Sequence, residues 1–167
     1  MHDDFILSDI AKDYPFPSQI ASCRFFAFIP NHFLIPEPSA RDAEIECDGR
    51  YLASVLRNLQ TESPDDLARI NQYLQVIVPD LQRVSVLTAG GYDILQFEMA
   101  GENTPFNASQ VSDGTLHALA ILTALFDARR TGVALVGIEE PETGLHPAAI
   151  RAIRDAMVEI GRDVQIV

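Results

Sequence analysis

The sequence has one lysine, no tryptophan and two cysteines among its 167 residues. Twelve basic residues stand against 24 acidic residues, which gives a formal net charge of −12. A surface with this charge repels phosphate backbones and anionic lipids, and the arginines are scattered along the chain rather than clustered. The composition therefore does not support binding of nucleic acid or membrane by this acidic chain, although a full-length protein that contains it could still bind nucleic acid.

Cysteine is also too sparse for a disulfide scaffold or a metal site. Cys23 and Cys47 are far apart and lack CxxC spacing, so we expect two buried thiols in a reducing cytosol. No apolar run approaches the roughly 18 residues of a membrane span, and the N-terminus lacks the basic and then apolar pattern of a signal peptide. We therefore expect a cytoplasmic protein.

A composition of 47% hydrophobic and 22% charged residues is typical of one soluble domain with a real core. Aromatic and branched residues at 24–35 predict a strand that is interrupted by Pro30. Apolar residues at helical spacing predict two helices, at 49–60 and 63–78, with Ser63 as a favourable start for the second.

The second half of the chain alternates between helices and strands. Residues 83–88 and 92–99 predict a hairpin around two glycines. The alternating elements that follow are a helix at 116–130, a strand at 133–138, a helix at 147–160 and a strand at 164–167. This order predicts a βα crossover into a parallel sheet, and therefore a mixed α/β fold. Because the last strand stops at the chain end, we expect the chain to be part of a longer protein.

Two adjacent carboxylates follow the apolar strand at 133–138. Ligands of open parallel sheets bind beyond the carboxyl ends of the strands, where Glu139 and Glu140 lie. Adjacent side chains that leave a strand are expected to point to different sides, so one could hold Mg²⁺ while the other acts as a general base. That division of roles suits phosphoryl transfer. Taken alone, the Glu-Glu-Pro-Glu sequence is also compatible with a solvated turn.

A small polar turn precedes the helix at 116–130. Ser112 is a candidate N-cap, and Gly114 leaves the backbone without a side chain, so the free N–H groups and the helix dipole could receive a phosphate. The sequence Ser-Asp-Gly is common in turns and carries no weight by itself.

The order of these segments is more specific than any one of them. A Ser-Asp-Gly turn, an apolar helix, an apolar strand that ends in Glu-Glu-Pro-Glu, and then Thr-Gly-Leu-His-Pro together resemble the second half of an ABC-type ATPase head. The resemblance is closest to the RecF, SMC and OLD-nuclease group of AAA-like ATPases. It implies a partial P-loop NTPase head over residues 1–167, with a parallel sheet and flanking helices in 111–167 and a helical and hairpin lobe in 1–110.

The resemblance also implies roles for individual residues. Residues 111–115 match the signature motif, so the resemblance places Ser112, Asp113, Gly114 and Thr115 against the γ-phosphate of ATP held by the opposite subunit. The strand matches the Walker B strand, with Glu139 at the Mg²⁺-directed position and Glu140 as the catalytic glutamate. ATP and Mg²⁺ are the implied cofactors, and a head-to-head homodimer is the implied assembly.

The segment after Glu140 matches the D-loop, which crosses the dimer interface in such heads. Its residues are Thr143, Gly144, Leu145 and His146. Considered by itself, His146 is interpreted first as a helix-entry residue, and His117 as an ordinary helix residue.

Three departures limit the resemblance. Glu139 stands where most members carry aspartate. The 167 residues contain no GxxxxGK[ST] loop, and Lys12 has no glycine near it. The switch histidine of such heads is expected beyond Val167. We therefore expect ATPase activity from the intact protein and little from this chain alone.

Two other functions stay open at this point. A metal-dependent phosphoesterase or nuclease could gather two cations on Glu139, Glu140 and Glu142. A non-catalytic dimerisation module would keep the interface of a head without its chemistry.

Overall fold

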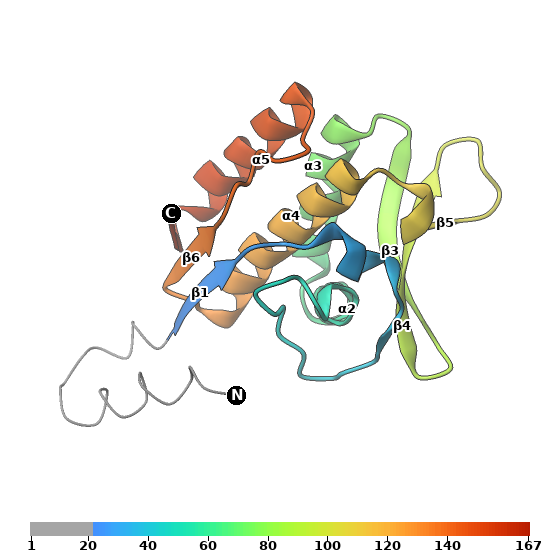
Figure 1. Ribbon diagram of the computed structural model, residues 1–167, viewed down its shortest axis with the longest axis horizontal. Coiled ribbons are helices and arrows are strands. Elements are labelled where there is room, and N and C mark those ends of the chain that lie inside the picture. The colour runs from blue at the N-terminus through green and yellow to red at the C-terminus, as the bar shows by residue number, and fades with distance from the viewer. Residues whose placement is uncertain (1–21) are drawn as a thin grey trace.

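The computed structural model describes residues 22–167, which form two sheets with helices between and beside them (Figure 1). Lys12 lies outside the described residues. A three-stranded parallel sheet has the order β1 (Cys23–Phe26), β6 (Leu135–Ile138) and β7 (Gln165–Ile166). The predicted parallel sheet and mixed α/β fold are confirmed.

The second sheet is antiparallel. It has the order β2 (Glu37–Pro38), β4 (Tyr92–Met99) and β3 (Leu81–Ala89), and β5 (Phe106–Asn107) also pairs with β4. The predicted hairpin is β3 and β4, joined by Gly90 and Gly91 with φ angles of 60° and 81°. Two consecutive residues in this left-handed region make the tight turn that suits the twist of a hairpin, and glycine adopts it without steric cost.

Helices α2 (Leu52–Glu62) and α3 (Pro64–Ile77) pack against β3. Both were predicted to within a few residues. Ser63 occupies the N-cap position of α3, but its side chain makes no capping hydrogen bond, and its N–H donates to the Leu59 carbonyl instead. The chain therefore turns directly from one helix into the next, with Pro64 fixing the first residue of α3.

Helix α4 (Asp113–Thr131) lies between the two sheets and contacts α2, α3, β6 and α5 (Pro147–Ile160) (Figure 1). Its residues from Thr115 to Ala128 are all buried, on every side of the helix. A helix at the centre of a domain is covered by protein on every side, so it needs apolar residues on every side. This is why the segment shows little amphipathic periodicity. The core of the described residues is built around it.

Two predictions in the N-terminal part were wrong. The predicted strand at 24–35 ends at Phe26, and a 3-10 helix, η2 (Pro30–Leu34), begins at the proline. Proline has no N–H to donate to a strand ladder, so the extended segment cannot continue through it. Cys47 is exposed and Cys23 is half-buried, so the expectation of two buried thiols also failed.

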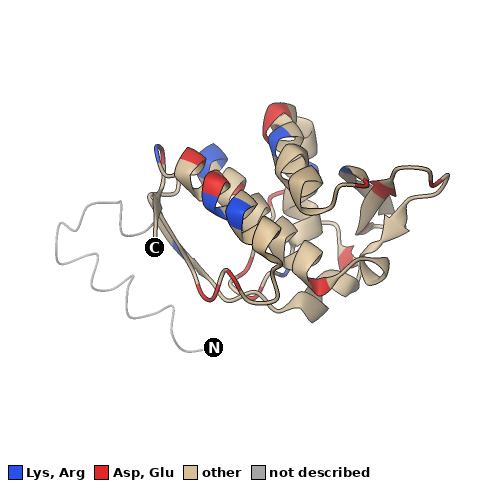
Figure 2. Cartoon of the chain, turned by 90° about the horizontal axis from the view of Figure 1, so that it is seen from above, with Lys and Arg blue, Asp and Glu red and all other residues tan. Residues whose placement is uncertain are grey.

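Charged residues of both signs are interspersed over the helices and loops rather than gathered on one face (Figure 2). No helix in residues 22–167 has the length and apolar character needed to cross a membrane.

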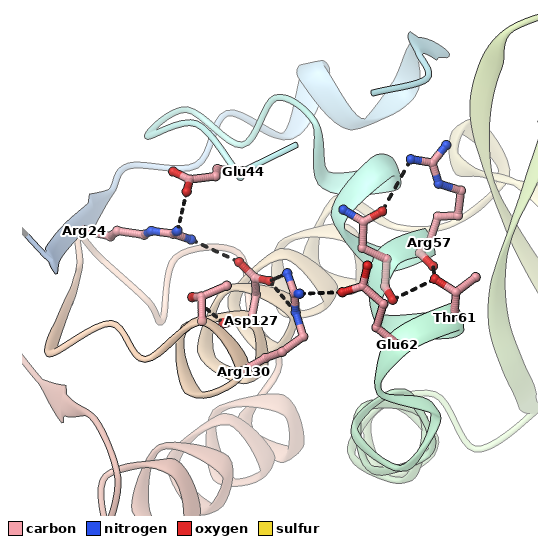
Figure 3. Close-up of polar contacts among 9 residues, drawn as sticks. Arg24, Glu44, Arg57, Thr61, Glu62, Asp127 and Arg130 are labelled. Atoms are coloured by element: carbon pink, nitrogen blue, oxygen red, sulfur yellow. Dashed lines mark hydrogen bonds and ion pairs between the residues drawn. The ribbon is translucent and has the colours of Figure 1, made fainter. Parts of the chain in front are cut away.

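Asp127 joins the start of the parallel sheet to the end of α4. Its carboxylate accepts hydrogen bonds from Arg24 of β1 at 3.0 Å and from Arg130 at 2.6 Å, and its side chain is 1% exposed (Figure 3). The two arginines also bind Glu44 and Glu62, at 3.0 Å and 2.7 Å. A buried carboxylate is tolerated here because charged donors occupy both of its oxygens.

Removal of this carboxylate is expected to destabilise the protein strongly. In Asp127→Ala, two arginines would face each other without their shared partner, so we expect a loss of about 3 kcal/mol in the free energy of unfolding, measured by urea denaturation. Asp155→Ala is the matched control, because the Asp155–Arg154 pair is exposed and its loss should cost under about 0.5 kcal/mol. Equal effects of the two variants would contradict a structural role for Asp127.

Candidate active site

The carboxyl end of β6 brings Glu139 and Glu140 out of the core. The N–H of Glu139 donates to the carbonyl of Phe26 at 2.8 Å, which extends the pairing of β6 with β1 by one residue. Both glutamates are exposed, whereas Val136, Gly137 and Ile138 before them are buried. The two carboxylates therefore keep their solvation although they follow directly on a buried strand.

Glu140 has an unusual backbone. Its φ angle is 45°, in the left-handed region, which is costly for a residue with a Cβ atom. Such residues are over-represented at functional sites, where the surrounding structure holds them in place. Two contacts with Thr143 hold Glu140: Thr143 Oγ1 donates to Glu140 Oε2 at 3.0 Å, and the Thr143 N–H donates to the Glu140 carbonyl at 2.9 Å. The first of these bonds also orients the carboxylate.

The turn continues through Gly144 to the start of α5. Gly144 has a φ angle of 73°, which glycine adopts easily, and the Leu145 N–H closes the turn on the Glu142 carbonyl at 3.1 Å. His146 is the N-cap of α5, where its Nδ1 accepts from the Ala148 N–H at 3.4 Å, and Pro147 occupies the first helical position. The helix-entry role predicted for His146 is thus observed.

The amino end of α4 lies against this turn. Ser112 caps the helix by accepting from the Thr115 N–H at 3.2 Å, and the two hydroxyl oxygens lie 2.8 Å apart. A Cβ atom on Gly114 would lie 2.6 Å from the Gly144 carbonyl oxygen, which is closer than real contacts allow. Only glycine at 114 permits this approach, so its lack of a side chain serves a contact within the chain as well as leaving the backbone accessible.

One cleft, with a volume of about 540 Å³, contains both the glutamates and the amino end of α4. It is lined by Ala27, Phe28, Ile29, Pro30, Asp113, Gly114, His117, Glu139, Glu140, Thr143 and Gly144. We expected the two glutamates to leave the strand on different sides, yet both line this cleft. The left-handed backbone at Glu140 turns the chain, so the alternation of a regular strand does not extend through this residue.

A second cleft of about 390 Å³ lies beside it and shares Gly114 and Gly144 with it. Ser112, Thr115, Leu145 and His146 line this second cleft, together with apolar residues of α3, β3 and β4. All ten candidate residues therefore lie in two adjoining clefts. Glu142 lines neither, and no three His, Cys, Asp or Glu side chains in residues 22–167 are grouped closely enough to hold a metal ion.

Comparison with known proteins assigns the chain to a family. A family model described as "AAA domain, putative AbiEii toxin, Type IV TA system" matches residues 32–167. The chain belongs to this AAA family. A search of curated proteins found no match.

A solved structure supports the fold of this AAA domain. That structure is described as concerning "ATP-driven dimerization and DNA stimulated activation of SMC ATPases", and it aligns with a TM-score of 0.50 at 11% sequence identity. The alignment covers 66% of this chain and 70% of the other. The AAA domain thus has the P-loop NTPase fold of an SMC-like head, as its sequence predicted.

Sequence reasoning missed the residues from Ala27 to Pro30 that line the AAA domain's cleft, and it missed one titratable residue there. His117 was interpreted as an ordinary helix residue, but it lines the cleft and is 6% exposed. Its ring packs edge-on against Phe28, with centroids 6.0 Å apart, and its burial lowers the pKa of the imidazole. The sequence feature that could have identified His117 as a cleft residue is its position one turn beyond Asp113, on the same side of the helix.

Proposed function

We propose that this AAA domain binds and hydrolyses ATP as part of a head-to-head dimer, with Glu140 as the catalytic base. The observation that carries the proposal is the strained backbone of Glu140 in a cleft that also contains the amino end of a long helix. Strain of this kind costs of order 1 kcal/mol or more and persists where it has a use.

The amino end of α4 fits a phosphate group. The first N–H groups of a helix have no partner within the helix, and the macrodipole favours an anion there. Asp113 and Gly114 line the cleft at this end, while the hydroxyls of Ser112 and Thr115 bond to each other and fix the first turn. In this proposal the backbone of the turn makes the phosphate contact, and the two hydroxyls preserve its shape.

The acidic end of the cleft fits part of a Mg²⁺ site. Glu139 would supply a carboxylate oxygen, a type of ligand that Mg²⁺ prefers. Phosphate oxygens and water commonly fill the remaining positions of such sites. A bound Mg²⁺ supplies charge neutralisation on the transferred phosphoryl group. The absence of a three-residue metal cluster in the described part of the chain agrees with a cation held jointly by one carboxylate and the nucleotide.

Glu140 would receive the proton of the attacking water. Its carboxylate is exposed in the cleft, and the bond from Thr143 leaves one oxygen, Oε1, available to that water. The general base must lie within hydrogen-bond reach of the proton that it abstracts, so the orientation imposed by Thr143 contributes to the reaction.

The dimer would join each nucleotide to two subunits. Ser112, Asp113, Gly114 and Thr115 would face the γ-phosphate bound by the opposite subunit, and residues 143–146 would cross between the subunits. The direct contact of Gly114 with Gly144 supports this arrangement, because it makes the signature turn and the D-loop one unit. We further propose that 111–167 carry these segments and that α2, α3 and the antiparallel sheet before them form a supporting lobe, whereas β1 belongs to the parallel sheet beside β6.

A metal-dependent phosphoesterase is a weaker candidate. It needs Glu139, Glu140 and Glu142 around two cations, but Glu142 does not line the cleft of the other two. A non-catalytic dimerisation module remains the rival of the ATPase proposal. ATP hydrolysis by a longer chain that includes a P-loop segment, which we call the completed head, would support the ATPase and exclude the non-catalytic module.

The 167-residue chain alone is expected not to bind ATP with micromolar affinity. The proposed site contributes the turn and the carboxylates, but the P-loop and its lysine, which cradle the triphosphate, have no counterpart in this sequence. Titration calorimetry with Mg²⁺–ATP tests this, with the completed head as the positive control. Micromolar binding by the chain alone would require a different nucleotide site from the one proposed.

A further inference from the structure

His117, which lines the cleft, has a buried hydrogen-bonding atom without a partner in residues 22–167. Its Nε2 is buried and makes no hydrogen bond with any described residue. A buried polar atom without a partner is costly, and native structures rarely retain one unless a ligand or water completes it. The side chain is 6% exposed and lines the same cleft as Asp113, Gly114, Glu139 and Glu140.

His32 provides a useful comparison. Its Nδ1 also lacks a hydrogen bond of good geometry, but that atom lies 3.4 Å from Asp48 Oδ2, and the side chain is 33% exposed. A charged neighbour and nearby solvent can therefore satisfy His32. His117 has an apolar neighbour, Phe28, against its ring, and its side chain lines the cleft.

The charged and polar groups of the cleft indicate which class of ligand could contact His117. Glu139 and Glu140 line the cleft and favour a cation, which commonly accompanies a phosphate. The backbone N–H groups at the α4 terminus, one helical turn from His117, favour the phosphate itself. Burial keeps the imidazole neutral at neutral pH, and a neutral imidazole carries one N–H donor.

We infer that His117 contacts the phosphate bound at the amino end of α4, with its Nε2–H donating a hydrogen bond to a phosphoryl oxygen. This inference rests on the proposed function and adds a binding residue to it. The phosphate would then lie along the side of α4 that carries Asp113, Gly114 and His117. The buried nitrogen would gain its missing partner in the bound state.

Selective labelling of histidine with ¹⁵N tests the contact directly in the head completed with its P-loop segment. The chain has four histidines, and His→Gln variants assign their signals. On addition of Mg²⁺, ADP and beryllium fluoride, we expect the His117 Nε2 signal to move toward that of a protonated, hydrogen-bonded nitrogen, while the His32 signal stays fixed. Amide signals of residues 113–115 report phosphate binding in the same sample.

The possible outcomes separate the two proposals. Movement of the amide signals without movement of His117 overturns this inference and leaves the proposed function intact. No movement at any of these positions overturns both. Movement of His117 together with the amides supports both.

Two substitutions distinguish a binding role from a packing role. His117→Leu removes the donor at similar volume and should weaken binding of Mg²⁺–ADP–beryllium fluoride about tenfold, whereas His117→Gln, which keeps an N–H near the same place, should stay within about threefold of the wild type. His32→Leu is the control and should not change the affinity. Because His117→Leu also removes an unpaired buried atom, the unliganded protein should unfold at the same or a higher temperature. Lower thermal stability with unchanged affinity would show that His117 only packs.

Discussion

Replacement of Glu140 by glutamine is expected to reduce ATP turnover by the completed head by a hundredfold or more, since general-base catalysis contributes roughly that much. The amide keeps the shape of the side chain and can still accept the Thr143 hydroxyl through its oxygen, but it cannot take a proton from water. Nucleotide binding should be retained, and the ATP-bound dimer should live longer because its release depends on hydrolysis.

Glu142→Gln is the matched control for this substitution. Glu142 belongs to the same exposed acidic turn and carries the same charge, but it does not line the cleft. Phosphate release and analytical ultracentrifugation should therefore give wild-type turnover and dimer lifetime for Glu142→Gln. Equal loss of turnover in both variants would indicate a general effect of acidic charge, and unchanged turnover in Glu140→Gln would remove Glu140 from its proposed role.

The parts of the fold and of the site that were predictable from the sequence depend on the conformational preferences of individual residues. Pro147 marks the start of α5, and Gly90 with Gly91 marks the hairpin, because proline and glycine restrict or release the backbone of their own residues. Glu139 and Glu140 were located by the same kind of reasoning, since a buried parallel strand must end in a polar opening.

The parts that were not predictable depend on contacts between distant segments. Phe28, which packs against the ring of His117, follows β1, a strand from a distant part of the sequence that pairs with β6. The approach of Gly114 to Gly144 likewise joins two turns that flank a helix and a strand. Spacing along one sequence indicates which face of a helix a residue occupies, but not which segment covers that face.

The contact between Gly114 and Gly144 changes what a substitution at 114 should do. A side chain at this position would meet the backbone carbonyl of Gly144, which cannot move without moving the turn that holds Glu140 through Thr143. Gly114→Glu should therefore have two effects: it should block the phosphate of the opposite subunit, and it should displace the catalytic turn of its own subunit. We expect ATP-driven dimerisation to be abolished and stability to fall by about 1–3 kcal/mol, a typical cost of overpacking.

Gly161→Ala controls for the packing effect alone. A Cβ atom there would lie 2.8 Å from the Met157 carbonyl oxygen, at the end of α5 and outside the cleft. This variant tests whether crowding against a backbone carbonyl is sufficient to prevent dimerisation. ATP-dependent association of Gly161→Ala should match that of the wild type in analytical ultracentrifugation.

Mixed dimers separate the two effects of Gly114→Glu. A Gly114→Glu subunit paired with a subunit that lacks its P-loop lysine places both lesions in one composite site, so the second site keeps an intact signature turn and an intact P-loop. We expect ATP-dependent association to return, because one nucleotide can again join the two subunits. Turnover should stay low, because the Glu140 that serves this second site belongs to the subunit whose catalytic turn is displaced by the Gly114→Glu substitution. Full turnover at this site would mean that Gly114 acts only on the opposite subunit, and failure of the two mutants to associate would contradict the shared site itself.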